Sequence, residues 1–189
     1  MSRARDIADI HDGSTDITTL GTVTTGTFNS TIGSSASFPS NQIIQVVSEN
    51  FENTSTASGT SEVVSFITKD ITSSKLNSKF LVMVNSITGA DDGSPIIILR
   101  RTISSSSTDI ATSAGITMRS DARLGNVRHG INFHLSYVDS PTQSASTSIN
   151  YKIILKGLNA SQDTFLGRTG FSSGDTTCLS SITIMELAP

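Results

Sequence analysis

One string in the sequence resembles the nucleophile turn of a serine hydrolase: Gly170-Phe171-Ser172-Ser173-Gly174. In such an enzyme a strand precedes the serine and a helix follows it, so that the sharp turn exposes the hydroxyl group. Here turn-forming residues lie on both sides, Leu166 to Thr169 before the string and Asp175 to Thr177 after it. We therefore predict a glycine-rich turn at this string and no catalytic serine.

Histidine and acidic residues form no familiar metal-binding pattern. None of His11, His129 and His134 stands two or four residues from another, as a helical zinc pair requires. Asp91-Asp92-Gly93 lacks the carboxylate at the twelfth position that closes an EF-hand loop, so we expect a hairpin turn there. The spacing predicts no metal centre within one chain, and it leaves open an ion held on an oligomer axis.

Other chemical signatures also fail on their context. The glycines Gly21 and Gly26 are not followed by the Lys-Ser/Thr pair of a phosphate-binding loop, so nucleotide binding is rejected. Cys178 is the only cysteine, which excludes an internal disulfide and a zinc site made of paired cysteines. The aspartates are too scattered to nominate the carboxylate pair of a polysaccharide-cleaving enzyme. We predict a protein that is not an enzyme and has no cofactor.

The densest charged stretch contains three arginines, Arg119, Arg123 and Arg128, followed by His129. This segment has no clear periodicity, and Asp121 lies among the arginines. Such a stretch is suited to contact an anionic sugar or a neighbouring subunit, and a solvated loop is the equally simple alternative. We retain these four residues as candidate surface contacts.

The composition favours strands and argues against two classes of partner. The chain holds 33 Ser and 25 Thr among 189 residues, and the branched side chain of Thr favours strand over helix. With 13 Lys+Arg against 16 Asp+Glu, the clustered positive field that nucleic acid requires is not expected. No run of 18 apolar residues occurs, so we expect neither a membrane span nor a secretion signal, and assembly in the cytoplasm.

The elements that carry these residues follow a strand pattern beyond Pro39. Short apolar runs separated by turn signals predict strands at Gln42–Val47, Glu62–Thr68, Phe80–Ile87, Ile96–Ile103, Ile131–Val138, Ile149–Leu155 and Ser181–Leu187, with a weaker one near Ile110–Met118. Loops are expected between them, among them Ser104–Thr108 and Asp139–Ala145. About eight antiparallel strands in residues 41–189 predict a jelly-roll-like β-sandwich.

Two of these runs are apolar on both sides of the strand. Phe80 to Val84 and Ile96 to Leu99 do not alternate with polar residues, unlike Ile131 to Val138. Their second face therefore needs a cover, either another sheet or another subunit.

The first 40 residues differ from the rest. Met1 to Ile10 is the one credible helical piece, too short to be stable without a partner surface. The following Gly/Ser/Thr-rich stretch carries widely spaced apolar residues that one chain cannot bury, so several copies would have to form a joint core from Leu20, Val23, Phe28, Ile32 and Phe38. A flexible linker is the alternative, although linkers seldom carry such residues at regular intervals.

Several phrases resemble small virion proteins of marine tailed bacteriophages. They are the opening Met1 to Asp9, the stretch Leu20 to Gly33, which is similar to the "T-S-G-T-F-N-G-T-I-G" phrase of phage tail fibres, Phe38 to Val47, and the ending Ser181 to Pro189. Ser30 stands where that fibre phrase commonly has Gly. The phrases cover both ends of the chain and little of its middle.

The resemblance implies a homotrimer located in the virion. Its N-terminal peptide would attach to another virion protein, tail or capsid, and we assign this role to Arg3, Arg5, Ile7 and Ile10. An intertwined β stem would complete residues 1–40, and the β domain would face outward as a short tail fibre or fibre tip. It would contact a host surface glycan or protein, with the loops Ser104–Thr108 and Asp139–Ala145 as candidate contact sites. A capsid decoration or head-fibre protein at a three-fold position of the shell is the alternative.

Overall fold

The computed structural model describes residues 39–90, 95–112, 130–170 and 176–189, and these residues contain ten strands and no helix. Eight strands are seven to twelve residues long: β1 (Ile43–Phe51), β3 (Val63–Thr72), β4 (Lys79–Ala90), β5 (Ile96–Ile103), β6 (Ser106–Thr112), β7 (Ile131–Asp139), β8 (Ser148–Lys156) and β10 (Ser180–Leu187). Two strands have four residues each: β2 (Ser55–Ser58) and β9 (Asp163–Leu166). The predicted all-β class is confirmed.

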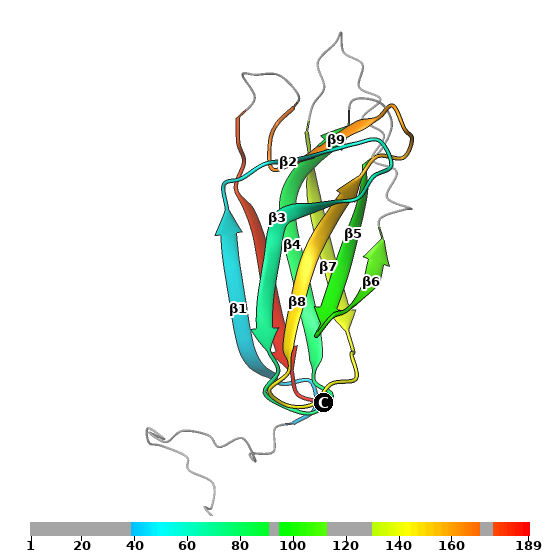
Figure 1. The fold of residues 1–189 in the computed structure, drawn as a ribbon. Helices are drawn as coiled ribbons and strands as arrows, with labels where there is room; N and C mark the ends of the chain where they lie inside the picture. Colours follow the sequence, from blue (N-terminus) through cyan, green and yellow to red (C-terminus); the bar gives the residue numbers. More distant parts are fainter. Residues whose placement is uncertain (1–38, 91–94, 113–129, 171–175) are drawn as a thin grey trace, which may run out of the picture. The chain divides into compact units, whose positions relative to one another are not determined.

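The strands form two antiparallel sheets that curl into a half-barrel around one core (Figure 1). Sheet A has the order β1-β10-β4-β9-β2, with β7 paired to β4 as well. Sheet B has the order β3-β8-β5-β6. Every strand pairing is antiparallel, as the absence of helical crossovers in the sequence predicted.

Alternate residues of the central strands fill the core between the two sheets. Phe80, Val82 and Val84 of β4 are fully buried, and they belong to the same cluster as Tyr151 and Ile153 of β8. The rings of Phe80 and Tyr151 lie 6.1 Å apart between centroids. Because each such apolar side chain contributes about 1.5–3 kcal/mol on burial, this shared core is what joins the sheets.

The two ends of the half-barrel carry different parts of the chain. At one end, here called the entry end, β1 begins beside the last residues, where Asn41 N donates to Ala188 O (2.9 Å) and Ala188 N donates to Gln42 O (2.8 Å). The letter C marks this end in Figure 1. At the opposite end, here called the far end, β4 and β6 end and β5 and β7 begin. The residues that flank segments 91–94 and 113–129 therefore lie at the far end. Those that flank 171–175 lie there too, because Thr169 O accepts from Gly130 N just before the start of β7.

The short pair β2 and β9 was not predicted. It continues sheet A at the far end, where β9 pairs with the last residues of β4. The turn after β9 depends on Gly167, which has a φ of +82°, and a Cβ there would lie 2.2 Å from Asn53 O. Only glycine satisfies both conditions without moving the backbone.

Two other sequence predictions are corrected. The loop expected at Ser104–Thr108 is a tight turn, because β6 already begins at Ser106 and pairs with β5. Ser104 adopts a positive φ of 55° there, and Ser107 and Thr102 share a hydrogen bond of 2.8 Å. The weaker strand predicted at Ile110–Met118 corresponds to β6 only as far as Thr112, and its remaining residues lie outside the described ones.

Candidate assembly surface

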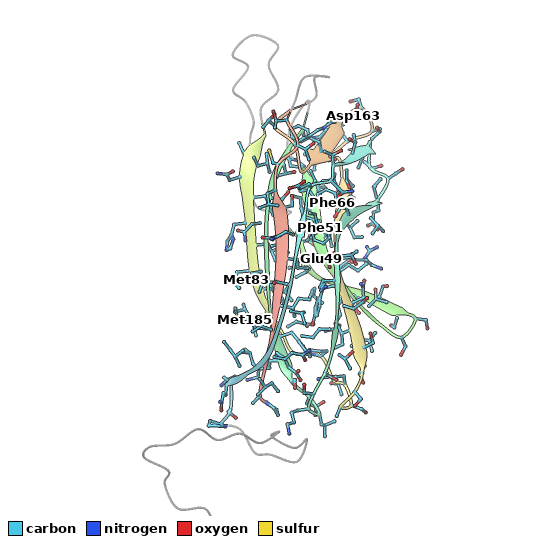
Figure 2. All side chains as sticks on the ribbon, turned by 90° about the vertical axis from the view of Figure 1, so that its left-hand side faces the viewer. Glu49, Phe51, Phe66, Met83, Asp163 and Met185 are labelled. Carbon is cyan, nitrogen blue, oxygen red and sulfur yellow. The ribbon has the colours of Figure 1, made fainter. Side chains whose placement is uncertain are left out.

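The outer face of sheet A is built from the alternate residues of its long strands. Val82 of β4 and Ile184 of β10 are fully buried in the core, so their strand neighbours Leu81, Met83 and Met185 point outward. Figure 2 shows Met83 and Met185 on this same side of the sheet. The outward side chains are half-buried by their neighbours and are covered by no second layer of described residues.

The strand register arranges the outward residues in rows that cross the sheet. One row is entirely apolar and consists of Val46, Met185, Leu81 and Val138. The row next to it toward the entry end contains Ile43, Leu187 and Lys79. Toward the far end the rows become polar but contain no Lys, Arg, Asp or Glu, first Ser48, Thr183, Met83 and Ser136, and then Asn50, Ser181, Asn85 and His134. From the apolar row onward, polarity therefore rises toward the far end.

We call the apolar part of this surface the apolar face: Ile43, Val46, Leu81, Met83, Val138, Met185 and Leu187. Ile43, Val46 and Val138 are 51%, 53% and 51% exposed. Within these rows the one Lys, Arg, Asp or Glu is Lys79 at the margin, and its Nζ donates to Asn41 Oδ1 (3.0 Å). A contiguous apolar area of this kind marks an interaction site in a folded protein.

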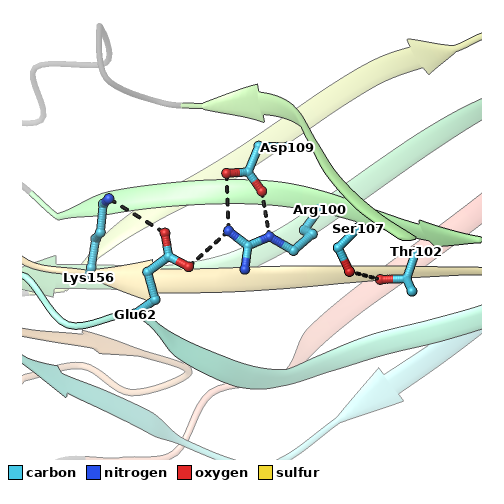
Figure 3. A network of polar contacts seen from close by, with 6 residues as sticks. All are labelled: Glu62, Arg100, Thr102, Ser107, Asp109 and Lys156. Atoms are coloured by element: carbon cyan, nitrogen blue, oxygen red, sulfur yellow. Dashed lines mark hydrogen bonds and ion pairs between the residues drawn. The ribbon is translucent and has the colours of Figure 1, made fainter. Parts of the chain in front are cut away.

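The outer face of sheet B carries ion pairs instead. Because Leu99 is fully buried in the core, Arg100 points outward, and its Nη2 donates to Glu62 Oε2 (2.9 Å) and Asp109 Oδ2 (3.1 Å). Lys156 Nζ lies 3.6 Å from Glu62 Oε1 (Figure 3). The hydrogen bond between Arg100 and Asp109 is the main cause that raises the pKa of the guanidinium and lowers the pKa of the carboxyl. We call this surface, from Glu62, Arg100, Asp109, Lys152 and Lys156, the charged face.

A third polar group lies between the sheets. Asp139, at the end of β7, accepts from Arg101 Nη1 of β5 (2.7 Å) and from Tyr151 Oη of β8 (2.7 Å). Asp139 is 5% exposed and Tyr151 is fully buried. Burial is the largest cause that raises the pKa of Tyr151, and the charge and hydrogen bond of Asp139 add to it. Tyr151 therefore stays protonated at neutral pH, and the group links the two sheets rather than acting as a base.

The entry end is held closed by a buried carboxylate. Glu186 of β10 is fully buried and accepts from Ser74 N (2.7 Å), Lys75 N (3.2 Å) and Ser78 Oγ (2.6 Å). Charge-assisted hydrogen bonds of this kind are stronger than neutral ones. The turn between β3 and β4 is thereby fixed to β10, directly beside the most apolar rows of sheet A.

Groups that could bind a metal do not gather in the described part of the chain, where no three His, Cys, Asp or Glu side chains lie together. No helix among the described residues is long and apolar enough to cross a membrane. The string Gly170 to Gly174 is described only at Gly170, and Asp91 to Gly93 lie outside the described residues.

Most residues singled out from the sequence lie outside the described residues. These are the attachment residues Arg3, Arg5, Ile7 and Ile10, the stem residues Leu20, Val23, Phe28, Ile32 and Phe38, and the surface contacts Arg119, Arg123, Arg128 and His129. The described residues that flank this last group, Thr112 and Gly130, lie at the far end. The two loops proposed as contact sites lie at the entry end, and in the second one Asp139 and Gln143 are 5% exposed.

The apolar face was only half visible in the sequence. The two-sided apolar run in β4 pointed to it, and Leu81 and Met83 indeed lie outside the core. The similar run in β5 has a different outcome, because Ile98 on the outer side is only 3% exposed within one chain. Strand register brings Val46 and Val138 into the apolar face. The sequence indicates register only through the alternation of its apolar and polar residues.

Comparisons with known proteins give no match, either to a protein-family model or to a curated protein sequence.

Proposed function

We propose that this chain is a non-enzymatic structural subunit of a virus particle, a homotrimeric short tail fibre or fibre tip of a tailed bacteriophage. The observation that carries the self-assembling part is the apolar face, since Val46 and Val138 are each about half exposed in an uncharged row. The proposed location in the virion rests on the resemblance of the N-terminal and C-terminal phrases to phage virion proteins.

The proposed architecture of the domain is a jelly-roll-like β-sandwich. The order β1-β10-β4-β7 in one sheet, facing β3-β8-β5-β6 in the other, supports it, because consecutive strands repeatedly change sheet. Such closed double sheets leave loops at the two ends of the strands, and loops on a rigid β scaffold commonly carry recognition.

The proposed orientation attaches the entry end to the particle and directs the far end toward the host. Pro39, which follows the attachment segment, belongs to the entry end, where Ser40 Oγ donates to Pro189 O (2.6 Å). The chain between Thr112 and Gly130, which contains the arginines Arg119, Arg123 and Arg128, departs from the far end. We therefore transfer the proposed host contact from the loops Ser104–Thr108 and Asp139–Ala145 to this end.

The oligomeric state is the first test. Light scattering of the purified full-length chain should give three times the mass of the 19.9-kDa subunit. A monomer at micromolar concentration would overturn the proposal, because both the joint-core stem and the apolar face would then stand uncovered.

The location on the particle is the second test. Antibodies raised against residues 39–189 should label the tail of virus particles that carry this chain, as seen by electron microscopy. Label spread over the head would favour the capsid decoration or head-fibre alternative, and particles without label would exclude a virion subunit.

A triple variant tests the proposed host contact. Replacement of Arg119, Arg123 and Arg128 by Ala should raise the equilibrium dissociation constant of virus adsorption to host cells at least about tenfold, a loss of roughly 1.4 kcal/mol in binding. Lys152→Ala on the charged face is the matched control, since it also removes positive charge. Equal adsorption by both variants would exclude these arginines as the contact.

A further inference from the structure

We infer that the apolar face is where a second copy of this chain packs, with the strands of the copies parallel and the face directed toward a three-fold axis. This inference rests on the proposed homotrimer and deepens it, because it assigns the subunit contact within residues 39–189. Neither the sequence phrases nor the stem residues assign that surface.

The size of the face fits a subunit contact. Four strands at a spacing of about 4.8 Å, over about eight residues of about 3.4 Å each, give a flat area on the order of 500 Å² for the rows from Ile43 to Asn50, polar rows included. A standard interface buries about 800 Å² of accessible surface on each partner, and protruding side chains make accessible area larger than flat area. The apolar face and the polar rows beside it together therefore supply most of one side of a stable interface.

The chemistry of the face fits its own copy. In a symmetric assembly identical patches lie around one axis. Any net charge on the patch would therefore be present on every copy, and these like charges would repel one another. The rows from Val46 to Asn85 contain no Lys, Arg, Asp or Glu, and Lys79 at the margin is already hydrogen-bonded to Asn41. A nucleic acid or an acidic protein would require the cations that this face lacks.

The change in polarity from row to row favours a parallel orientation of the copies. Copies that attach through the same N-terminal segment have their entry ends on the same side, so equal rows lie at equal height. The row of Val46, Met185, Leu81 and Val138 then forms one apolar layer with its copies, and the row that contains Asn85 forms a hydrogen-bonding layer above it. An antiparallel pair would instead set apolar rows against the polar row.

The apolar face begins close in sequence to the segment that the sequence analysis assigns to a joint core. Ile43 and Leu187 end the face at the entry end, four residues after Pro39.

A pair of matched variants tests the inference. Val46→Glu combined with Val138→Glu places two carboxylates in the apolar row. We expect the dissociation constant of the trimer, measured by dilution, to be at least about 100-fold higher than that of the wild type. The control is Val64→Glu on the outer side of sheet B, where Val64 is 58% exposed against 53% for Val46, and both residues lie in edge strands. The control should keep the wild-type dissociation constant.

Cross-linking decides the question if the double variant fails to fold. Leu81→Cys in a Cys178→Ser background should link copies to one another with a short bismaleimide, because Leu81 lies in a central strand of the face. Val64→Cys in the same background should not. Circular dichroism checks that both variants are folded.

The outcomes separate this inference from the proposed function. A wild-type monomer overturns the homotrimer itself. A wild-type trimer that tolerates the double Glu variant, or that gives no cross-link through Leu81→Cys, keeps the proposed function and overturns the assignment of the contact to the apolar face.

Discussion

The outer faces of the two sheets differ although both sheets close the same core. Sheet A presents the apolar face, whose charged margin is limited to Lys79, whereas sheet B presents Arg100 between Glu62 and Asp109. Ion pairs on an exposed face satisfy each other and need no partner. Apolar side chains that stay half exposed have no such partners within the chain, and this difference is why we propose the outer face of sheet A as the contact surface.

The contrast is clearest between two residues from similar runs. Leu81 of β4 and Ile98 of β5 both stand in stretches that are apolar on both sides of the strand. Ile98 is 3% exposed within one chain, whereas Leu81 stays partly exposed. A two-sided apolar strand therefore does not by itself indicate a subunit contact, and the exposure of its outer side has to be known.

The largest effect on the free energy of unfolding is expected from a substitution at the buried carboxylate of Asp139. Asp139→Ala should lower the free energy of unfolding by about 3–5 kcal/mol, because Arg101 and the Tyr151 hydroxyl lose their shared acceptor in a buried site. Asp109→Ala on the charged face should cost less than about 1 kcal/mol. Urea unfolding measures both, and equal losses would contradict the distinction between the buried link and the exposed network.

Alkaline pH should reveal the same buried link. The pKa of Tyr151 is raised in the folded state and is 10.0 in an unperturbed tyrosine, so above pH 10 the unfolded chain loses a proton that the folded chain keeps. The free energy of unfolding should therefore fall by up to about 1.4 kcal/mol per pH unit above pH 10 from this residue. Tyr151→Phe should reduce that fall, and Tyr137→Phe, at a residue 37% exposed, is the control. Identical pH profiles for both variants would exclude Tyr151 as the source.

The charged face should contribute little to stability and nothing to assembly. Arg100→Gln removes the centre of the ion-pair network, and we expect a loss of about 1 kcal/mol or less in the free energy of unfolding. The mass of the assembly should stay at the wild-type value in light scattering. Dissociation of the Arg100→Gln variant would show that the charged face, and not the apolar face, joins the copies.

Salt should give the smallest effect and should separate the two faces. Raising NaCl from about 0.1 M to 1 M shortens the screening length from about 10 Å to 3 Å, so the stability difference between wild type and Arg100→Gln should shrink by a few tenths of a kcal/mol. The dissociation constant of the assembly should not rise, because apolar contacts are not screened. Dissociation at high salt would point to a polar interface.

Much of the fold could be predicted from alternation. In β8 the residues Ile149, Tyr151, Ile153 and Leu155 all lie in the core, as their two-residue period indicated. β2 and β9 were not predictable in this way, because strands of only four residues are too short to show a period and are defined by the neighbours they pair with. The serine run before Thr108 resembled a loop for the same reason, since its pairing with β5 makes it a strand.

The sequence by itself determined the all-β class, the antiparallel connections and the apolar character of both sides of β4. Those features follow from side-chain branching and from a period of two, which are local properties. Only the tertiary structure decided that Val46, Met185, Leu81 and Val138 share one row, and that Ile98 needs no partner. Register between strands far apart in the chain fixes such rows, and shifting one strand by a single residue would turn its apolar side chains to the other face of the sheet.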